Sequence, residues 1–300
     1  KVSPISYDAV AFTSFSRDHL DYHSSMKEYF DVKWDFIKDQ IAKGAGAFIS
    51  EGVESYINEF YPKEDQSKFE FYRNNKEDYA GFKIAEMDIS ATKLSIFSKL
   101  ASYKLSVKLM GFYAIENLVA AVLCLEATSK KKLDLSKASD IRSVPGRLDA
   151  VQNDKNRFVF IDYAHTPDAL YKTCELLKPL CKGSFRVLFG AGGDRDRGKR
   201  PLMAKASEQF ADQIIVTSDN PRTEDPDAIL EDIKAGFINL DRVEFIVDRR
   251  EAIRSVITNS VANDVILIAG KGHEDYQIIG TTKVHFDDKE EAHTILGELK

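Results

Sequence analysis

The second half of the chain alternates short apolar runs with helical patterns, and this alternation constrains the fold more than any other feature. The apolar runs predict buried strands, and the amphipathic segments between them predict helices. Repeated strand–helix units of this kind build a parallel sheet that helices cover on its faces. The runs cover residues 158–163, 185–189, 213–217, 243–247 and 264–269. We therefore predict an α/β fold whose C-terminal domain is doubly wound and Rossmann-like, with a mostly parallel sheet, followed by two antiparallel strands at 276–280 and 283–286.

The first half follows a different pattern. A predicted strand at residues 8–15 precedes a long amphipathic helix at 25–43, and a glycine turn then leads into a strand at 47–49. The following segments alternate apolar and polar side chains until a second apolar helical pattern begins. They cover residues 69–73, 81–97 and 103–109 for strands and 113–128 for the helix. We predict two domains, 1–142 and 143–300, with the junction at residues 141–146.

Composition fits two cores and argues against several kinds of partner. The 300 residues are 43% apolar and 30% charged, which is typical of a globular chain slightly too long for one ordinary domain. A net charge of -6 argues against a nucleic-acid groove. We find no stretch of about 20 apolar residues, the length of a membrane span, and no signal-peptide core. We therefore expect a cytoplasmic protein with reduced cysteines and no nucleic-acid or membrane partner. A monomer is expected as well, although composition does not give the oligomeric state.

The segment Ser218 to Arg222, Ser-Asp-Asn-Pro-Arg, directly follows a predicted strand. Open α/β sheets bind ligands at the carboxyl ends of their strands, so these polar groups are placed for a site. Pro221 restricts Asn220, whose amide can donate and accept, while the planar fork of Arg222 matches a carboxylate. This combination suits a free amino acid. Taken alone, however, these residues are better explained by a turn with a surface arginine.

Three further strand ends carry polar groups. The first strand of this half ends in Asp162-Tyr163-Ala164-His165, and the last parallel strand ends in Gly270-Lys271-Gly272-His273-Glu274. Glu274 is placed to accept an ammonium group. The glycine-rich run from Gly190 to Pro201 is expected to present Arg195 toward a carboxylate near Asn220 and Arg222. A charged loop folded on itself remains the competing interpretation of this run.

The glycine-rich run also contains a G-x4-G-K frame, from Gly193 to Lys199. We reject it as a phosphate-binding loop, because Arg200 stands where serine or threonine should hold magnesium. The carboxylates of Asp194 and Asp196 would also repel phosphate.

Two histidines and two aspartates lie between Ser16 and His23, after the first predicted strand. One of the histidines could bind a divalent ion, since a magnesium site takes few protein ligands. A polar helix entry explains the segment equally well. On the helix that follows, the spacing of Lys33 alone predicts a lysine whose side chain reaches the solvent.

Seven strings in this order resemble the Mur ligases, specifically the MurE type. They are SRDHLDYH, MKEYFDVKW, VPGRLDAV, DYAHTPDAL, GAGGDRDRGKRPLM, SDNPRTEDP and GKGHEDYQ. The resemblance implies an ATP-dependent ligase of peptidoglycan synthesis. In this family the terminal carboxylate of a UDP-N-acetylmuramoyl dipeptide becomes an acyl phosphate, which the amino group of a third amino acid attacks. Cations must offset the phosphate charge that develops, so Mg2+ is implied as well as ATP.

The resemblance also implies roles for single residues. His19 resembles the family's metal-binding histidine and Lys33 its carbamylated lysine, whose added carboxylate helps to hold a second metal, which reverses the interpretation of Lys33 from spacing. A nucleotide-facing group corresponds to Asn117, Arg147, Asp162, Tyr163 and His165, and the pocket for the incoming amino acid corresponds to Arg195, Asn220, Arg222, Gly270 and Glu274. Within that pocket the DNPR form is similar to that of enzymes that add meso-diaminopimelate; lysine, ornithine and lanthionine stay open.

The sequence departs from the family pattern in two ways. The family's nucleotide-binding loop, G-x-x-G-K-[ST], and its N-terminal domain are not found here, so we expect a fragment of a longer ligase that shows no turnover by itself. Ala114 also stands where the family usually has an asparagine, which puts nucleotide contact at that point in doubt. The alternatives are a non-catalytic homologue that binds the amino acid or nucleotide, and a ligase of the folylpolyglutamate synthetase type.

Overall fold

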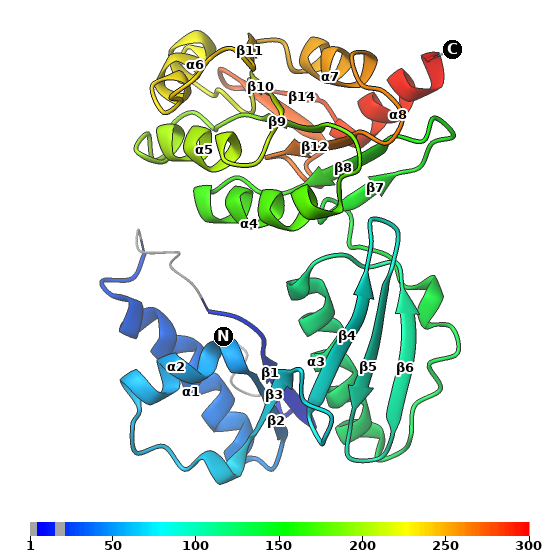
Figure 1. Ribbon diagram of the computed structural model, residues 1–300. Helices are drawn as coiled ribbons and strands as arrows, with labels where there is room; N and C mark the ends of the chain where they lie inside the picture. The colour runs from blue at the N-terminus through cyan, green and yellow to red at the C-terminus, as the bar shows by residue number, and fades with distance from the viewer. Residues whose placement is uncertain (1–4, 16–21, 300) are drawn as a thin grey trace. The chain divides into compact units, whose positions relative to one another are not determined.

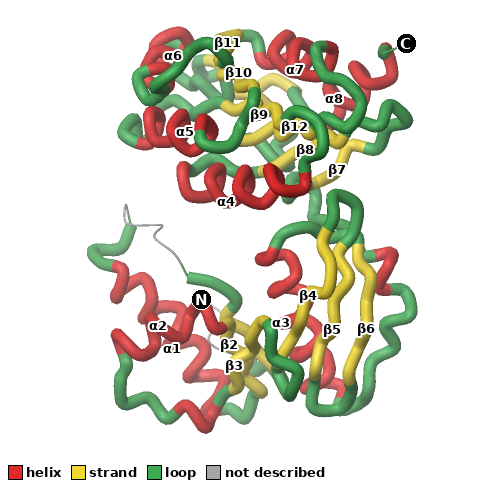
Figure 2. The backbone as a smooth tube through the Cα atoms, in the orientation of Figure 1, coloured by secondary structure: helices red, strands yellow, loops and turns green. Residues whose placement is uncertain are grey.

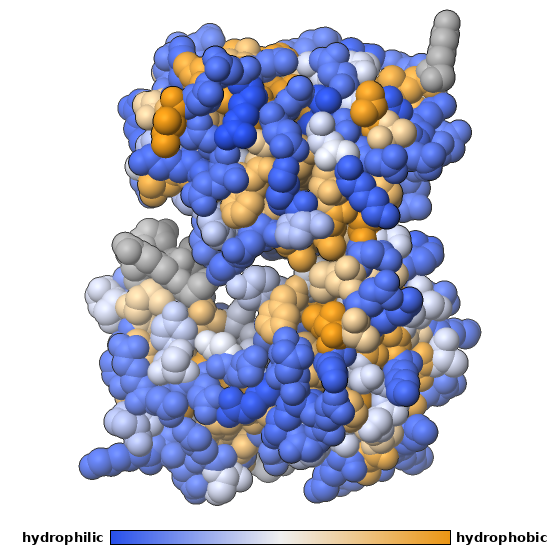
Figure 3. Space-filling view, in the orientation of Figure 1, coloured by the Kyte–Doolittle hydropathy of each residue, from blue (hydrophilic) through white to orange (hydrophobic). Residues whose placement is uncertain are grey.

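The computed structural model describes residues 5–15 and 22–299, and it divides the chain into two compact units, Lys1–Arg142 and Ser143–Lys300 (Figure 1). Each unit has its own sheet and its own helices (Figure 2). On the face seen in Figure 3 the surface of both units is mostly hydrophilic, and apolar side chains show in small groups.

Unit 1 contains a sheet in the order β1-β2-β3-β4-β5-β6. Its first three strands and β4 are paired in parallel, whereas β4, β5 and β6 are antiparallel. The strands are β1 (Ala9–Phe12), β2 (Gly46–Ser50), β3 (Glu70–Asn74), β4 (Gly81–Met87), β5 (Thr92–Phe97) and β6 (Ser102–Val107). The helices are α1 (Met26–Ala42), α2 (Glu51–Phe60) and α3 (Phe112–Ser129), with 3-10 turns at Gln66–Lys68 and Ala138–Asp140.

The pattern at residues 81–97, which reads as one β segment, is a hairpin of two strands. Asp88 makes the turn, because its Oδ1 accepts hydrogen bonds from the backbone N–H groups of Ser90 and Ala91. An aspartate that caps its own turn in this way breaks a strand without glycine or proline. Helix α2 was not predicted at all. It begins directly after β2, with Ser50 as both the last residue of the strand and the N-cap of the helix.

Helix α3 is long and apolar enough to cross a membrane by length and composition, which corrects the expectation that no segment would be. In the structure it is a core helix of unit 1. Its buried apolar residues pack with Phe48, Tyr72 and Phe82 in one cluster. Its two buried carboxylates are also satisfied inside the unit: Glu116 accepts a hydrogen bond from Ser50 at 2.6 Å, and Glu126 accepts one from Tyr103.

Unit 2 has the predicted doubly wound arrangement. Its sheet runs in the order β11-β10-β9-β12-β8-β7, and all pairs are parallel except that of the edge strand β7 with β8. The strands are β7 (Asp149–Val151), β8 (Phe158–Asp162), β9 (Phe185–Phe189), β10 (Gln213–Thr217), β11 (Val243–Ile246) and β12 (Val265–Ala269), and the predicted antiparallel pair is β13 (Tyr276–Ile279) with β14 (Thr282–His285).

The helices of unit 2 cover both faces of this sheet (Figure 1). They are α4 (Pro167–Leu177), α5 (Lys199–Glu208), α6 (Pro226–Lys234), α7 (Arg249–Thr258) and α8 (Asp288–Glu298), with a 3-10 turn at Lys178–Leu180. Local sequence explains where α4 and α6 begin. Thr166 and Asp225 are N-caps whose side chains accept a backbone hydrogen bond, and each precedes a proline in the first turn. The helices are thereby fixed so that the preceding loops lie at the carboxyl edge of the sheet.

Candidate amino-acid-binding site

Three loops of unit 2 meet at the carboxyl edge of its sheet. They follow β9, β10 and β12, and because β9 pairs with both of the other strands, the loops are neighbours. From strand ends alone, the sequence predicted that these three loops would converge together with a fourth, the loop after β8. The loops bring together Asn220, Arg222, Gly270 and Glu274, and they place Arg195 nearby.

Asn220 lies at the centre of this site and is only 4% exposed. Its amide nitrogen donates to Glu274 Oε2 at 2.9 Å, and its Oδ1 accepts from the backbone N–H of Ile278 at 2.9 Å. Its backbone carbonyl accepts from the N–H of Gly193 in the loop after β9. One buried residue therefore connects the β9 loop, the β12 loop and the β13–β14 hairpin.

Arg222 has a left-handed backbone, with φ of 52°, which is uncommon for a residue other than glycine. The hairpin holds it there, because the Arg222 N–H donates to Ile278 and the Arg222 carbonyl accepts from Gly280. Its Nη1 donates to the carbonyl of Gly193 at 2.7 Å. A Cβ atom on Gly192 would lie 3.0 Å from that nitrogen and 3.8 Å from Cγ of Arg195, so both arginine side chains flank Gly192. This brings the guanidinium of Arg222 and the side chain of Arg195 to the same glycine of the β9 loop.

The start of the β12 loop needs glycine for two reasons. Gly270 has φ of 120°, and a Cβ atom there would lie 2.8 Å from the carboxylate of Asp219. The site predicted from sequence thus contains a second carboxylate, Asp219, that was not singled out. A buried cation was missed too: Lys271 is fully buried, 3.5 Å from Glu274 and 3.8 Å from Asp219. Its position between two glycines gave no periodic signal of burial.

A second group lies around the end of β8. The guanidinium of Arg147 is 4.8 Å from the ring centroid of Tyr163, whose ring also contacts those of His165 and His273. The loop of Gly272 reaches this group, because a Cβ atom there would lie 2.7 Å from Tyr163 Cβ. Three of the four residues carried over for unit 2 as nucleotide-facing are therefore clustered.

The fourth residue, Asp162, binds the backbone of two loops. Its two carboxylate oxygens accept hydrogen bonds from the backbone N–H groups of Leu148 and Ala164. Burial raises the pKa of this carboxyl, and the hydrogen bonds to Leu148 and Ala164 oppose that effect. It fixes the loops that carry Arg147 and Tyr163.

The glycine-rich run after β9 is tied to the loop after β10 and to α6. The backbone N–H of Asp194 donates to Glu224, and the carboxylate of Asp194 accepts from Thr223, so this loop does not direct that N–H at a phosphate. Arg200 is fully buried and binds both Glu224 and Asp232. Arg200 lowers the pKa of Glu224 to about 2. These contacts agree with the rejection of a phosphate-binding loop.

The candidate residues of unit 1 are less completely placed. His19 lies outside the described residues. Lys33 lies on the exposed side of α1, with its Nζ 5.2 Å from the ring centroid of Tyr29. Asn117 is exposed in the first half of α3, and Ala114 is half-buried one turn earlier. Among residues 5–15 and 22–299 there is no group of three or more metal-binding side chains.

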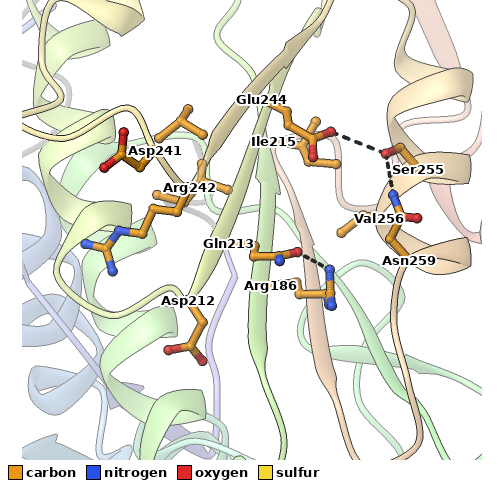
Figure 4. A pocket seen from close by; sticks show the side chains of 12 residues that line it. Arg186, Asp212, Gln213, Ile215, Asp241, Arg242, Glu244, Ser255, Val256 and Asn259 are labelled. Carbon is orange, nitrogen blue, oxygen red and sulfur yellow. Dashed lines mark hydrogen bonds between the residues drawn. The ribbon is translucent and has the colours of Figure 1, made fainter.

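Two cavities lie elsewhere. One of about 160 Å³ is at the amino ends of β9, β10 and β11, opposite the edge described above (Figure 4). Its charged side chains are largely paired: Arg186 binds Asp264 and Gln213, and Asp212 binds Lys178. The other, of about 430 Å³, lies in unit 1 between the start of β2 and the end of α3. Neither cavity is lined by a residue that was predicted from the sequence to belong to a functional site.

Comparison with known proteins agrees with the resemblance. The family description "Mur ligase middle domain" matches residues 1–125, and "Mur ligase, glutamate ligase domain" matches residues 146–272. Among curated proteins, the UDP-N-acetylmuramoyl-L-alanyl-D-glutamate--2,6-diaminopimelate ligase of Haemophilus influenzae is 39% identical over 97% of this chain and 60% of its own length. The enzyme of that name from Pseudomonas putida is 36% identical over 99% of this chain and 61% of its own length.

Solved structures give the same result. A UDP-N-acetylmuramoyl-L-alanyl-D-glutamate--2,6-diaminopimelate ligase is 33% identical, with a TM-score of 0.62 over 96% of this chain and 59% of that one. A folylpolyglutamate synthase from Thermotoga maritima has a TM-score of 0.64 at 15% identity over 90% of this chain and 59% of that one, which shows a shared fold only. The chain spans about 60% of the length of the curated relatives it matches. With two family domains matched in order and relatives identical at more than a third of the aligned positions, the chain belongs to the Mur ligase family.

Proposed function

We propose that this protein acts as an ATP-dependent ligase that adds meso-diaminopimelate to UDP-N-acetylmuramoyl-L-alanyl-D-glutamate, in cytoplasmic peptidoglycan synthesis. The observation that carries this proposal is the grouping of Asn220, Arg222 and Glu274 at one sheet edge. A carboxylate beside guanidinium groups matches the distal end of a diamino dicarboxylic acid, which carries an ammonium and a carboxylate on one carbon. The names of the relatives support the same substrate.

In this proposal Glu274 binds the distal ammonium, and Arg222 with Arg195 binds the distal carboxylate. Glu274 already accepts a hydrogen bond from Asn220, which orients its carboxylate. Arg222 uses Nη1 on the Gly193 carbonyl, and the planar guanidinium has further N–H groups for a ligand. Lysine and ornithine have the ammonium without the carboxylate, so they would use only half of this arrangement.

We further propose that Arg147, Tyr163 and His165 face the nucleotide, with Asn117 contributing from α3. Mg2+ would be held by His19 and by a carbamate on Lys33. The carbamate is needed because an ammonium has no lone pair for a metal, whereas a carbamate supplies the oxygen ligands that magnesium prefers. Lys33 is exposed, so its amine is accessible to carbon dioxide. In the full-length protein, Lys33→Ala should nearly abolish turnover, and short carboxylates should partly restore it. Wild-type turnover in this variant would exclude the carbamate.

The substrate assignment is tested by steady-state kinetics of the full-length protein with UDP-N-acetylmuramoyl dipeptide and ATP. The third substrate is varied among meso-diaminopimelate, lysine, ornithine and lanthionine, and phosphate release is measured. We expect the highest kcat/KM with meso-diaminopimelate. A preference for lysine would refute the assignment, and absence of turnover with all four would favour a non-catalytic binding homologue.

A further inference from the structure

Lys271 is a buried cation in the candidate site that neither the sequence nor the family comparison assigns a role. It follows β12 and has no exposed surface. Its Nζ lies 3.3 Å from Asn220 Oδ1, 3.5 Å from Glu274 Oε2 and 3.8 Å from Asp219 Oδ1. Burial of a lysine costs free energy unless its ammonium is paired, and these three oxygens provide the pairing.

The charges around Lys271 explain why it is needed. Asp219 and Glu274 are two carboxylates in one site, and among the described residues Lys271 is the one cation that forms an ion pair with either. Arg249 is nearby and also fully buried, but its guanidinium is engaged by Asp288 and by backbone carbonyls. Lys271 is therefore the ion-pair partner that the two carboxylates share, and the carboxylate of Glu274 is the one proposed above to meet the ammonium of a ligand.

Lys271 also fixes the orientation of the Asn220 amide. An ammonium only donates, so the atom of Asn220 that faces Lys271 must be the oxygen. The N–H of Ile278 donates to the same oxygen. The amide nitrogen is thereby directed at Glu274 Oε2. Without the ammonium, Asp219 and Glu274 would both lack the cation with which they pair, and Glu274 would lose the contact that holds its carboxylate in place.

We propose that Lys271 is a positioning residue for the incoming amino acid, which orients Asn220 and holds Glu274 toward the distal ammonium. This proposal rests on the proposed function, because it needs an amino acid with an ammonium at that point. It predicts that loss of Lys271 weakens the use of the amino acid and not the use of ATP. It also predicts that the effect passes through Glu274.

The test uses the full-length protein and meso-diaminopimelate. Lys271→Met should raise KM for the amino acid by about 10- to 100-fold and leave KM for ATP within about twofold, because a charge-assisted contact is lost only at the amino-acid site. Lys283→Met is the matched control. Lys283 also lies over the ring of Tyr276, with Nζ 3.6 Å from its centroid against 5.5 Å for Lys271, but it is exposed on β14. We expect it to leave both KM values unchanged.

A double-mutant cycle separates positioning from general destabilisation. In the Glu274→Gln background, Lys271→Met should raise KM for the amino acid by less than about threefold, since the carboxylate it holds is already gone. Equal effects in both backgrounds, or an equal rise in KM for ATP, would overturn the proposal. Should the methionine variant fail to fold, Lys271→Gln carries the same test, because it is neutral but keeps a hydrogen-bond donor. If the wild type uses no diamino acid, the proposed function fails instead.

Discussion

Single side chains decide what this site can recognise, and Arg222 is the sharpest case. If its guanidinium binds a distal carboxylate, Arg222→Ala should lower kcat/KM for meso-diaminopimelate by the equivalent of roughly 1.5–3 kcal/mol, the scale of a hydrogen bond to a charged group. The decrease in kcat/KM for lysine should be much smaller. Arg222→Lys keeps the charge but not the planar guanidinium, so its kcat/KM for meso-diaminopimelate should lie between those of the wild type and Arg222→Ala. Equal losses for lysine and diaminopimelate, measured by steady-state kinetics, would show that the arginine only supports the loop after β9 through its hydrogen bond to Gly193.

A second residue-scale prediction concerns the buried Arg200. Glu224→Gln removes one of its two carboxylate partners and should lower the free energy of unfolding by about 3 kcal/mol at pH 7, the lower end for a broken buried pair, because Asp232 remains. The pKa of Glu224 is lowered from 4.5 to about 2, so its contribution is present above pH 4.5 and is lost as the pH falls toward 2. Urea denaturation should therefore show a smaller difference in free energy of unfolding between the wild type and Glu224→Gln at pH 3 than at pH 7.

Glu231→Gln is the control for that experiment. Glu231 pairs with Lys234 on the same helix, but both side chains are exposed, so the variant should change stability by no more than about 0.5 kcal/mol. A difference between wild type and Glu224→Gln that stays constant from pH 7 to pH 3 would contradict the linkage.

The sequence indicates some residues of the candidate site and not others. Asn220, Arg222 and Glu274 could be proposed because each follows an apolar strand, and strand ends meet at one edge. Lys271 and Asp219 stand in the same loops but were overlooked, since burial of a charge depends on partners from other loops that no local pattern reveals. Pair geometry, such as the contact from Asn220 to Glu274, follows only from the assembled fold.

At the scale of elements, β8, β9, β10 and β12 could be predicted to within one residue at either end, because strands buried on both faces are continuous apolar runs. The edge strand β7 has three residues and no such run, and it was missed. Helix α2 was missed because no glycine or proline separates it from β2.

The end of α3 offers a test at this scale. Lys130 is the C-cap of α3 and has a left-handed backbone, with φ of 53°, a position that usually holds glycine. Lys130→Gly should raise the free energy of unfolding of unit 1 by about 0.5–1 kcal/mol, because relief of the left-handed conformation exceeds the entropy that glycine loses. Lys132→Gly, two residues on and not left-handed, should lower it slightly or leave it unchanged. Urea denaturation of both variants measures the difference, and equal effects would mean that the backbone at Lys130 carries no strain.

At the scale of the molecule, three core clusters of the described residues each use residues of one unit. One cluster combines β8, β9, β10 and β12 with α7 and α8, all in unit 2, whereas two others use only unit 1 residues. The candidate amino-acid site is likewise built from loops of unit 2 alone. The sequence predicted a junction at residues 141–146 from the change of pattern, and the chain divides into its compact units between Arg142 and Ser143.

We therefore expect residues 143–300, produced alone, to fold as they do in the whole chain, since a domain of about 150 residues buries roughly 70% of the surface of its unfolded chain. Backbone amide NMR spectra of the two proteins should overlay for unit 2, apart from residues near the junction. Added meso-diaminopimelate should shift the amides of Gly193, Asn220 and Gly270 in both, and Glu274→Gln should reduce those shifts. If the isolated unit gave the narrow amide dispersion of an unfolded chain, its core would depend on residues before Ser143. If it folded but diaminopimelate shifted no amide at the sheet edge, unit 2 alone would not suffice to bind the amino acid.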